Sequence, residues 1–86
     1  MGEYSVTFAR SAARELEGLD EPLISRVLSR IESLVREPRP SGCRKVRGAR
    51  NVWRIRVGDY RVIYAVDDKK RIVDVIAVRH RSEAYR

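Results

Sequence analysis

One segment restricts the fold more than any other: residues 52–66 alternate apolar and polar side chains on both sides of a Gly58-Asp59 pair. Alternation with a period of two is typical of a strand that has one buried face. Glycine supplies the positive φ that a two-residue hairpin turn requires. We therefore predict an antiparallel hairpin in which Arg56 lies directly opposite Arg61.

This hairpin register divides the side chains between two faces. The apolar face, which we expect to lie under helices, comprises Trp53, Ile55, Val57, Val62 and Tyr64. The opposite face carries Arg54, Arg56 and Arg61. Like charges across a ladder destabilise a sheet unless an anion lies between them, and arginine binds phosphate with a planar fork of donors. The arginines therefore predict a phosphate-binding site; the alternative is a solvated face whose charge blocks aggregation.

Helical periodicity dominates the N-terminal half of the chain. Residues 4–8 alternate as a short strand with Phe8 on its buried face. Apolar residues then recur three or four apart over residues 9–19 and again over 21–37, which predicts two amphipathic helices. Asp20 is a candidate N-cap for the second helix.

The remaining patterns complete one small sheet. Residues 43–48 form a possible edge strand, residues 67–70 a turn, and residues 72–78 are apolar on both faces, as in a central strand. We predict the order β-α-α-β-β-β, with the possible extra strand. The fold class is α+β: a mostly antiparallel sheet with two helices packed on one face, in a single domain spanning residues 1–86.

Length and composition exclude several classes of protein. The 86 residues contain no run of 18 apolar side chains, so we expect no membrane span. The single cysteine, Cys43, excludes an internal disulfide framework and a cysteine-based zinc site. We expect a cytoplasmic protein that binds no metal and no cofactor.

The positive charge is concentrated in the middle of the chain. The formal net charge is +7, and residues 39–61 contain eight basic residues against Asp59 alone. Clustered arginine and lysine are typical of a surface that binds a polyanion. An evenly solvated surface would have spread these charges along the chain.

Several stretches together resemble the RelE/ParE superfamily of toxins from type II toxin–antitoxin systems. They are the β-α-α-β-β order, Lys45–Gly48, the hairpin segment Trp53–Tyr64 and the ending Val78–Tyr85. The resemblance covers nearly the whole chain, and the C-terminal tyrosine is closer to the RelE type. RelE-type members cut mRNA in the ribosomal A site without a metal, whereas ParE-type members poison DNA gyrase.

The resemblance implies a set of site residues. Arg54 and Arg56 match the two basic positions on the strand before the hairpin, and Arg61 matches the arginine that follows the hairpin tyrosine. Arg79 matches the late arginine of the family, and Tyr85 the terminal tyrosine. The resemblance thus agrees with the three arginines that share one face of the hairpin.

The general base stays open between Tyr85 and His80. Arginine cannot act as a base, because it stays protonated, and RelE commonly has lysines where this chain has Arg54 and Arg56. Tyrosine serves if nearby arginines lower its pKa, and histidine is the commonest base near neutral pH. Some relatives use a glutamate–histidine pair, but the early position of that pair is Arg44 here.

The last strand leaves a second question open. If its alternation is unbroken, His80 rather than Arg79 shares the face of Arg61. The face of Arg79 therefore depends on whether the strand is regular.

The resemblance implies a ribosome-dependent, metal-independent mRNA endoribonuclease that leaves a 2′,3′-cyclic phosphate. Its expected partners are the ribosome, mRNA and an acidic, RelB-like antitoxin. Further contacts to the RNA backbone are expected from Lys45, Arg47, Arg50 and Arg81; Lys45 and Arg47 alternate onto one side of their strand. The alternatives are a ParE-like gyrase inhibitor and a catalytically inactive RNA-binding relative, since arginines replace the usual lysines.

Overall fold

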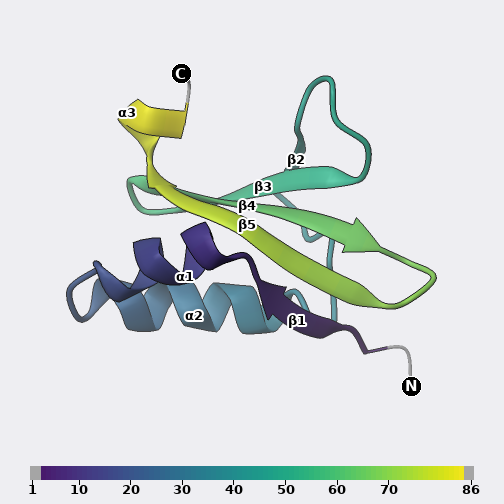
Figure 1. Ribbon diagram of the computed structural model, residues 1–86, viewed down its shortest axis with the longest axis horizontal. Coiled ribbons are helices and arrows are strands. Elements are labelled where there is room, and N and C mark those ends of the chain that lie inside the picture. Colours follow the sequence, from purple (N-terminus) through teal and green to yellow (C-terminus); the bar gives the residue numbers. More distant parts are fainter. Residues whose placement is uncertain (1–2, 85–86) are drawn as a thin grey trace.

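A computed structural model describes residues 3–84, and in it α1 and α2 lie against one face of a five-stranded sheet (Figure 1). In chain order the elements are β1 (Ser5–Phe8), α1 (Arg10–Glu17), α2 (Leu23–Ser33), β2 (Arg44–Lys45), β3 (Val52–Val57), β4 (Tyr60–Asp67), β5 (Ile72–His80) and α3 (Arg81–Ala84). The strand order is β1-β5-β4-β3-β2; β1 is parallel to β5 and the other pairs are antiparallel. The predicted α+β fold and its central last strand are confirmed.

The two longer helices pack one stripe of side chains onto the sheet. The buried residues of this stripe are Ala12, Leu16, Val27 and Ile31. Their four-residue spacing within each helix belongs to the pattern of three- or four-residue intervals that predicted the helices. Among residues 3–84, no helix is long and apolar enough to cross a membrane.

The ends of α2 differ from the prediction of a helix over 21–37. Asp20 is not the N-cap: Pro22 holds that position, and Asp20 contributes only its backbone oxygen, which accepts from the Ile24 N–H at 3.0 Å. After Ser33 the next N–H groups bond to carbonyls three residues back, which tightens the last turn. The tightened turn keeps Leu34 fully buried while the chain leaves the helix.

The predicted register of the β3–β4 hairpin is confirmed. Trp53 lies opposite Tyr64, Ile55 opposite Val62, and Arg56 opposite Arg61. Gly58 has a φ of 60°, the left-handed conformation that the turn requires. The expected apolar face is buried except for Trp53, which is half-buried.

A bulge interrupts β5. Val75 and Ala77 lie opposite adjacent residues of β4, so Ile76 between them has no partner on that strand. On the other side of β5, beyond the end of β1, α1 supplies the hydrogen bonds: Ser11 Oγ donates to the Ile76 carbonyl at 3.1 Å, and the Val78 N–H donates to Glu15 Oε1 at 2.8 Å. The bulge moves every later residue of β5 to the face opposite the one that strict alternation predicts.

The first strand departs from its prediction at its end. Val6 is half-buried, but Phe8 is 41% exposed, so its placement on the buried face was wrong. β1 is an edge strand with a neighbour on one side only, and Phe8 is its last residue, two residues before α1 begins. Its ring therefore has little to pack against.

A buried tyrosine fastens the loop after α2 to the sheet. Tyr64 is fully buried, and its hydroxyl donates to the Pro38 carbonyl at 2.7 Å. Burial raises the pKa of the Tyr64 phenol, which therefore stays a hydrogen-bond donor at neutral pH.

A second fastening joins the same loop to the β4–β5 turn. Arg39 Nη2 lies 2.8 Å from Asp68 Oδ2, and the Tyr4 hydroxyl donates to Asp68 Oδ1 at 2.7 Å. The guanidinium of Arg39 also stacks on Trp53, 5.3 Å from its ring centroid. The hydrogen bonds from Arg39 and Tyr4 hold the pKa of the Asp68 carboxyl below its ordinary value of 3.8.

We expect Tyr64→Phe to lower the free energy of unfolding by about 1–2 kcal/mol, because it leaves a partly buried carbonyl without its donor. Urea unfolding measures this loss. The matched control is Tyr60→Phe, since the Tyr60 hydroxyl has no hydrogen-bond partner among residues 3–84. Equal losses in the two variants would contradict the role of the Tyr64 bond.

We expect Asp68→Asn to lower the unfolding temperature at pH 7 but not at low pH. A carboxyl whose pKa is lowered by folding stabilises the fold above its unfolded pKa, and that stability is lost as the pH falls through the folded pKa. The two proteins should therefore begin to converge as the pH falls below 3.8 and coincide once it is below the lower pKa of the folded state, as followed by thermal unfolding across pH. Asp20→Asn is the control, and a difference that persists in acid would exclude the ionised carboxylate as its cause.

Candidate functional site

Three arginines form a row across the open face of the sheet, the face away from α1 and α2. Arg56 lies opposite Arg61, and Arg61 lies opposite Arg79, so the row crosses β3, β4 and β5. The β5 bulge brings Arg79 into line, so the question that the sequence left open is resolved in favour of Arg79 over His80. We call these three residues the arginine row.

A second arginine pair extends the row toward the sheet edge. Arg44 on β2 lies opposite Arg54 on β3. These two residues, together with Gly42, Ile55, Arg56 and Arg61, line a cavity of about 500 Å³, which we call the arginine cavity. Sequence reasoning missed Arg44 as a site residue, because the pairing of β2 with β3 depends on the path of the 46–51 loop.

The positions of two row members are set by specific contacts. Arg56 Nε donates to the Gly58 carbonyl at 3.0 Å, which folds the side chain toward its own hairpin turn. Arg79 Nε lies 3.2 Å from Glu15 Oε2, the carboxylate that also accepts the Val78 amide. Glu15 thus offsets part of the charge at one end of the row, and the sequence carries no local signal of this contact.

The structure does not bring His80 to the arginine row. His80 lies opposite Tyr60, one residue along from the Arg61–Arg79 pair, and so projects to the other face. Its ring meets Tyr60 edge to face at 5.4 Å. Its Nδ1 accepts from the Ser82 N–H at 3.3 Å, which ties the histidine to the start of α3.

The terminal tyrosine, Tyr85, lies outside the described residues. The helix that leads to it is attached to the hairpin, since the Arg81 N–H donates to the Asp59 carbonyl at 2.7 Å. α3 therefore begins beside the turn of the β3–β4 hairpin, two residues after Arg79 of the arginine row.

The four residues predicted to bind the RNA backbone are all exposed but lie in different places. Lys45 ends β2 and lies opposite Trp53, on the face away from Arg54. Arg47 and Arg50 lie in the loop that follows, and Arg81 begins α3. The expected alternation of Lys45 and Arg47 along one strand was wrong, because β2 ends at Lys45.

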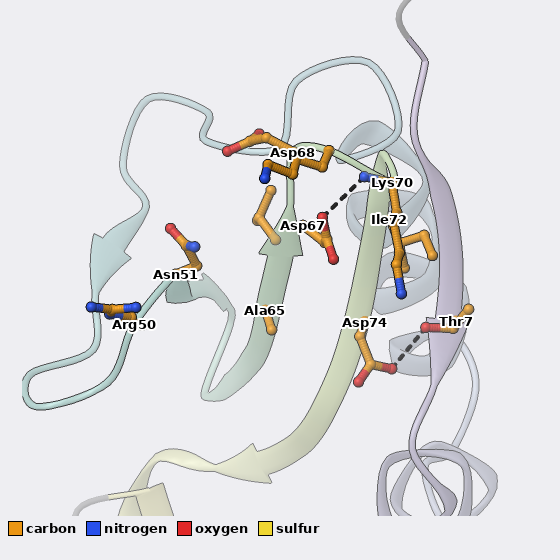
Figure 2. Close-up of a pocket in the computed structure, with 11 residues that line it drawn as sticks. Thr7, Arg50, Asn51, Ala65, Asp67, Asp68, Lys70, Ile72 and Asp74 are labelled. Atoms are coloured by element: carbon orange, nitrogen blue, oxygen red, sulfur yellow. Dashed lines mark hydrogen bonds between the residues drawn. The ribbon is translucent and has the colours of Figure 1, made fainter.

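A larger cavity, of about 760 Å³, occupies the other end of the open face (Figure 2). Asp74 projects into it and accepts from Thr7 Oγ1 at 2.8 Å, and Asp67 accepts from the Lys70 N–H at 3.0 Å. Carboxylates repel phosphate at close range. The lining of this larger cavity also includes Arg50, Lys69 and Lys70, one base for each of its three carboxylates, whereas the arginine cavity is lined by four arginines and by no acid of residues 3–84, so size alone does not identify the anion-binding end.

The arginine row and cavity suit a phosphate group in chemistry as well as charge. Guanidinium groups donate to the non-bridging oxygens and stabilise the negative charge that develops when a phosphoryl group reacts. None of them can take up a proton. Within residues 3–84, no three His, Cys, Asp or Glu side chains are placed to hold a metal ion together.

Comparisons with known proteins agree with this geometry. A family described as "ParE toxin of type II toxin-antitoxin system, parDE" matches residues 6–85. Toxin RelE of Mycobacterium tuberculosis is 32% identical over 84 residues, covering 96% of this chain and 87% of that protein.

Solved structures show the same fold. The archaeal RelE–RelB complex from Pyrococcus horikoshii contains a chain that matches with a TM-score of 0.83 at 28% identity, covering 96% of this chain and 99% of that one. The RelBE2 toxin–antitoxin complex from M. tuberculosis matches with a TM-score of 0.79 at 30% identity, covering 92% and 99%. With the family match over nearly its whole length, this chain belongs to the ParE toxin family of type II toxin–antitoxin systems, as a RelE-like member.

Proposed function

We propose that this toxin inhibits translation by cutting mRNA on the ribosome. The observation that carries the proposal is the arginine row with its adjoining cavity: five guanidinium groups on one sheet face. Such a surface binds a phosphodiester and stabilises charge on it. The RelE names of the relatives favour a ribonuclease over other uses of a phosphate site.

The proposed reaction is a transesterification within the RNA. The 2′-oxygen bonds to the adjacent phosphorus as the bond from phosphorus to the 5′-oxygen breaks, which leaves a 2′,3′-cyclic phosphate and a 5′-hydroxyl. Arg61, at the centre of the row, stabilises the phosphoryl oxygens, with Arg54, Arg56 and Arg79 around it. These fixed cations supply the positive charge that a metal ion provides in other nucleases, so we expect no metal requirement.

We assign the general base to Tyr85 rather than to His80. His80 projects away from the arginine row, and its Nδ1 is engaged by the Ser82 amide. Tyr85 follows α3, which starts beside the hairpin turn. A proton taken from the 2′-hydroxyl and a proton given to the leaving 5′-oxygen complete the balance of the reaction.

The proposed partner in the cell is an acidic, RelB-like antitoxin. Solved relatives from P. horikoshii and M. tuberculosis are complexes with an antitoxin. A net charge of +7 with an exposed phosphate site would otherwise bind nucleic acid without selection. An acidic segment that folds on binding would neutralise that surface.

One observation favours a second candidate function, inhibition of DNA gyrase. The matching family is described as the ParE toxin family. The resemblance to ParE-type members therefore also implies inhibition of DNA gyrase. A gyrase inhibitor of this fold would act by binding, without cutting RNA.

An in vitro translation reaction separates the candidates. We expect cut mRNA with 2′,3′-cyclic phosphate ends, at chelator concentrations low enough to leave ribosomes intact. The matched measurement is DNA supercoiling by gyrase with the same protein preparation. Intact mRNA with blocked supercoiling would favour the gyrase candidate, and arrested translation with intact mRNA would favour an inactive RNA-binding protein.

Alanine substitutions test the placement of the site. We expect Arg61→Ala to lower the rate of mRNA cleavage about 10²–10³-fold, the usual loss when one preorganised donor is removed. Arg54→Ala, Arg56→Ala and Arg44→Ala should each lower it less. The free energy of unfolding should change by no more than about 0.5 kcal/mol, because these side chains are not core residues.

The control for this series is Arg14→Ala, which removes an exposed arginine of α1. Cleavage and thermal unfolding are measured on the same samples. If the variants of Arg54, Arg56 and Arg61 all keep full activity while folded, the site lies on another face.

A further inference from the structure

A second basic cavity lies between α2 and the β3–β4 hairpin. Its volume is about 430 Å³, and its lining includes Arg26, Arg30, Arg56, Ser29 and Gly58. We call it the α2 groove. Arg26 and Arg30 are four residues apart on α2, so they project from the same side of the helix.

Backbone carbonyls and close packing hold the three guanidinium groups of the groove. Arg30 Nη1 donates to the Arg56 carbonyl at 3.5 Å, and Arg56 Nε donates to the Gly58 carbonyl at 3.0 Å. Arg26 Nη2 lies 3.6 Å from the point that a Cβ on Gly58 would occupy, so its guanidinium rests over the turn. A carbonyl orients a guanidinium without neutralising it.

Carboxylates neutralise other arginines of the chain but not these. Arg36, Arg39 and Arg79 each lie within 4.0 Å of a carboxylate. Two acids adjoin lining residues in sequence: Glu21 accepts from Ser25 at 2.6 Å, and Asp59 follows Gly58 in the turn, but neither forms an ion pair with Arg26, Arg30 or Arg56 among residues 3–84. The α2 groove therefore presents three positioned charges that lack a counter-ion within the described chain.

The α2 groove is connected to the arginine cavity. Arg56 lines both, because it stands at the hairpin edge between the open face of the sheet and α2. The positive surface thus continues around the hairpin, from Arg44 and Arg54 through Arg56 to Arg26 and Arg30.

We propose that the α2 groove binds the sugar–phosphate backbone of the same single-stranded RNA whose reacting phosphate occupies the arginine cavity. This inference rests on the proposed function and adds a second contact to it. Regularly spaced phosphates match separate guanidinium groups, each of which can donate two hydrogen bonds to one phosphate.

The lining of the groove favours RNA over an acidic peptide. Peptide recognition places apolar anchors in pockets, and the large apolar side chains exposed among residues 3–84 are Phe8 and Leu28. Neither lines the groove. Pro22 and Val57 supply the apolar part of its lining, and the long side chains that reach into it from α2 are Arg26 and Arg30, as in contacts to a nucleic-acid backbone.

The test compares Arg26→Gln/Arg30→Gln with Arg10→Gln/Arg14→Gln, the equivalent pair on exposed positions of α1. Glutamine removes the charge and keeps a similar helix propensity. The probes are 2′-O-methyl oligouridines of about 3 and about 12 nucleotides, which lack the attacking hydroxyl. The dissociation constant is measured from low to moderate salt, because each phosphate contact to single-stranded RNA adds about 0.7 to the slope of log K against log salt.

We expect the α2 double variant to reduce the slope by about 1.4 for the longer probe and to leave it unchanged for the shorter one. The α1 double variant should match the unsubstituted protein on both. An unchanged slope for the longer probe overturns the inference. An equal reduction of the slope for both probes also overturns it, and so does a loss of affinity that is seen only for an acidic antitoxin peptide. If the salt slopes contradict the inference but mRNA is still cut on the ribosome, the proposed function stands and only the role of the α2 groove is refuted. If the slopes are as expected but mRNA stays intact, the proposed function is refuted and RNA binding by the groove stands.

Discussion

The pairing of β4 with its two neighbours determines both the core and the site. One face of β4 carries Val62, Tyr64 and Val66, all essentially buried, and the other carries Arg61 at the centre of the arginine row. A shift of one residue in either pairing would exchange these faces and bury an arginine. The hydrophobic effect on one side of the strand therefore positions the charges on the other.

The part of the fold that follows from local chemistry was predictable. Gly58 and Asp59 leave one geometry for the hairpin, and alternation on each side of them defines its register. The side-by-side placement of Arg54 and Arg56, with Arg61 across the ladder, followed from that register alone. The resemblance to the RelE/ParE superfamily pointed to the same three positions, because they match basic positions of the family's motifs.

What escaped prediction depends on contacts distant in sequence. The bulge at Ile76, which Ser11 of α1 contacts, determines that Arg79 rather than His80 lies in the arginine row. The sequence around Ile76 contains no pattern that predicts a bulge. Arg44 became part of the site through pairing across a loop whose path the sequence does not specify. The early end of α2 likewise reflects the tertiary position of Leu34, which helical periodicity cannot distinguish from another helical turn.

Glu15 also covers part of an edge of the sheet. Where β1 ends, the outer side of β5 would present bare amides and carbonyls, which invite strands from other molecules; Ser11 and Glu15 satisfy them instead. A foreign strand that pairs there must displace Glu15, and the same displacement removes the counter-ion of Arg79. One carboxylate thus contributes both to the protection of this edge from aggregation, together with Ser11, and to the electrostatic balance of the arginine row.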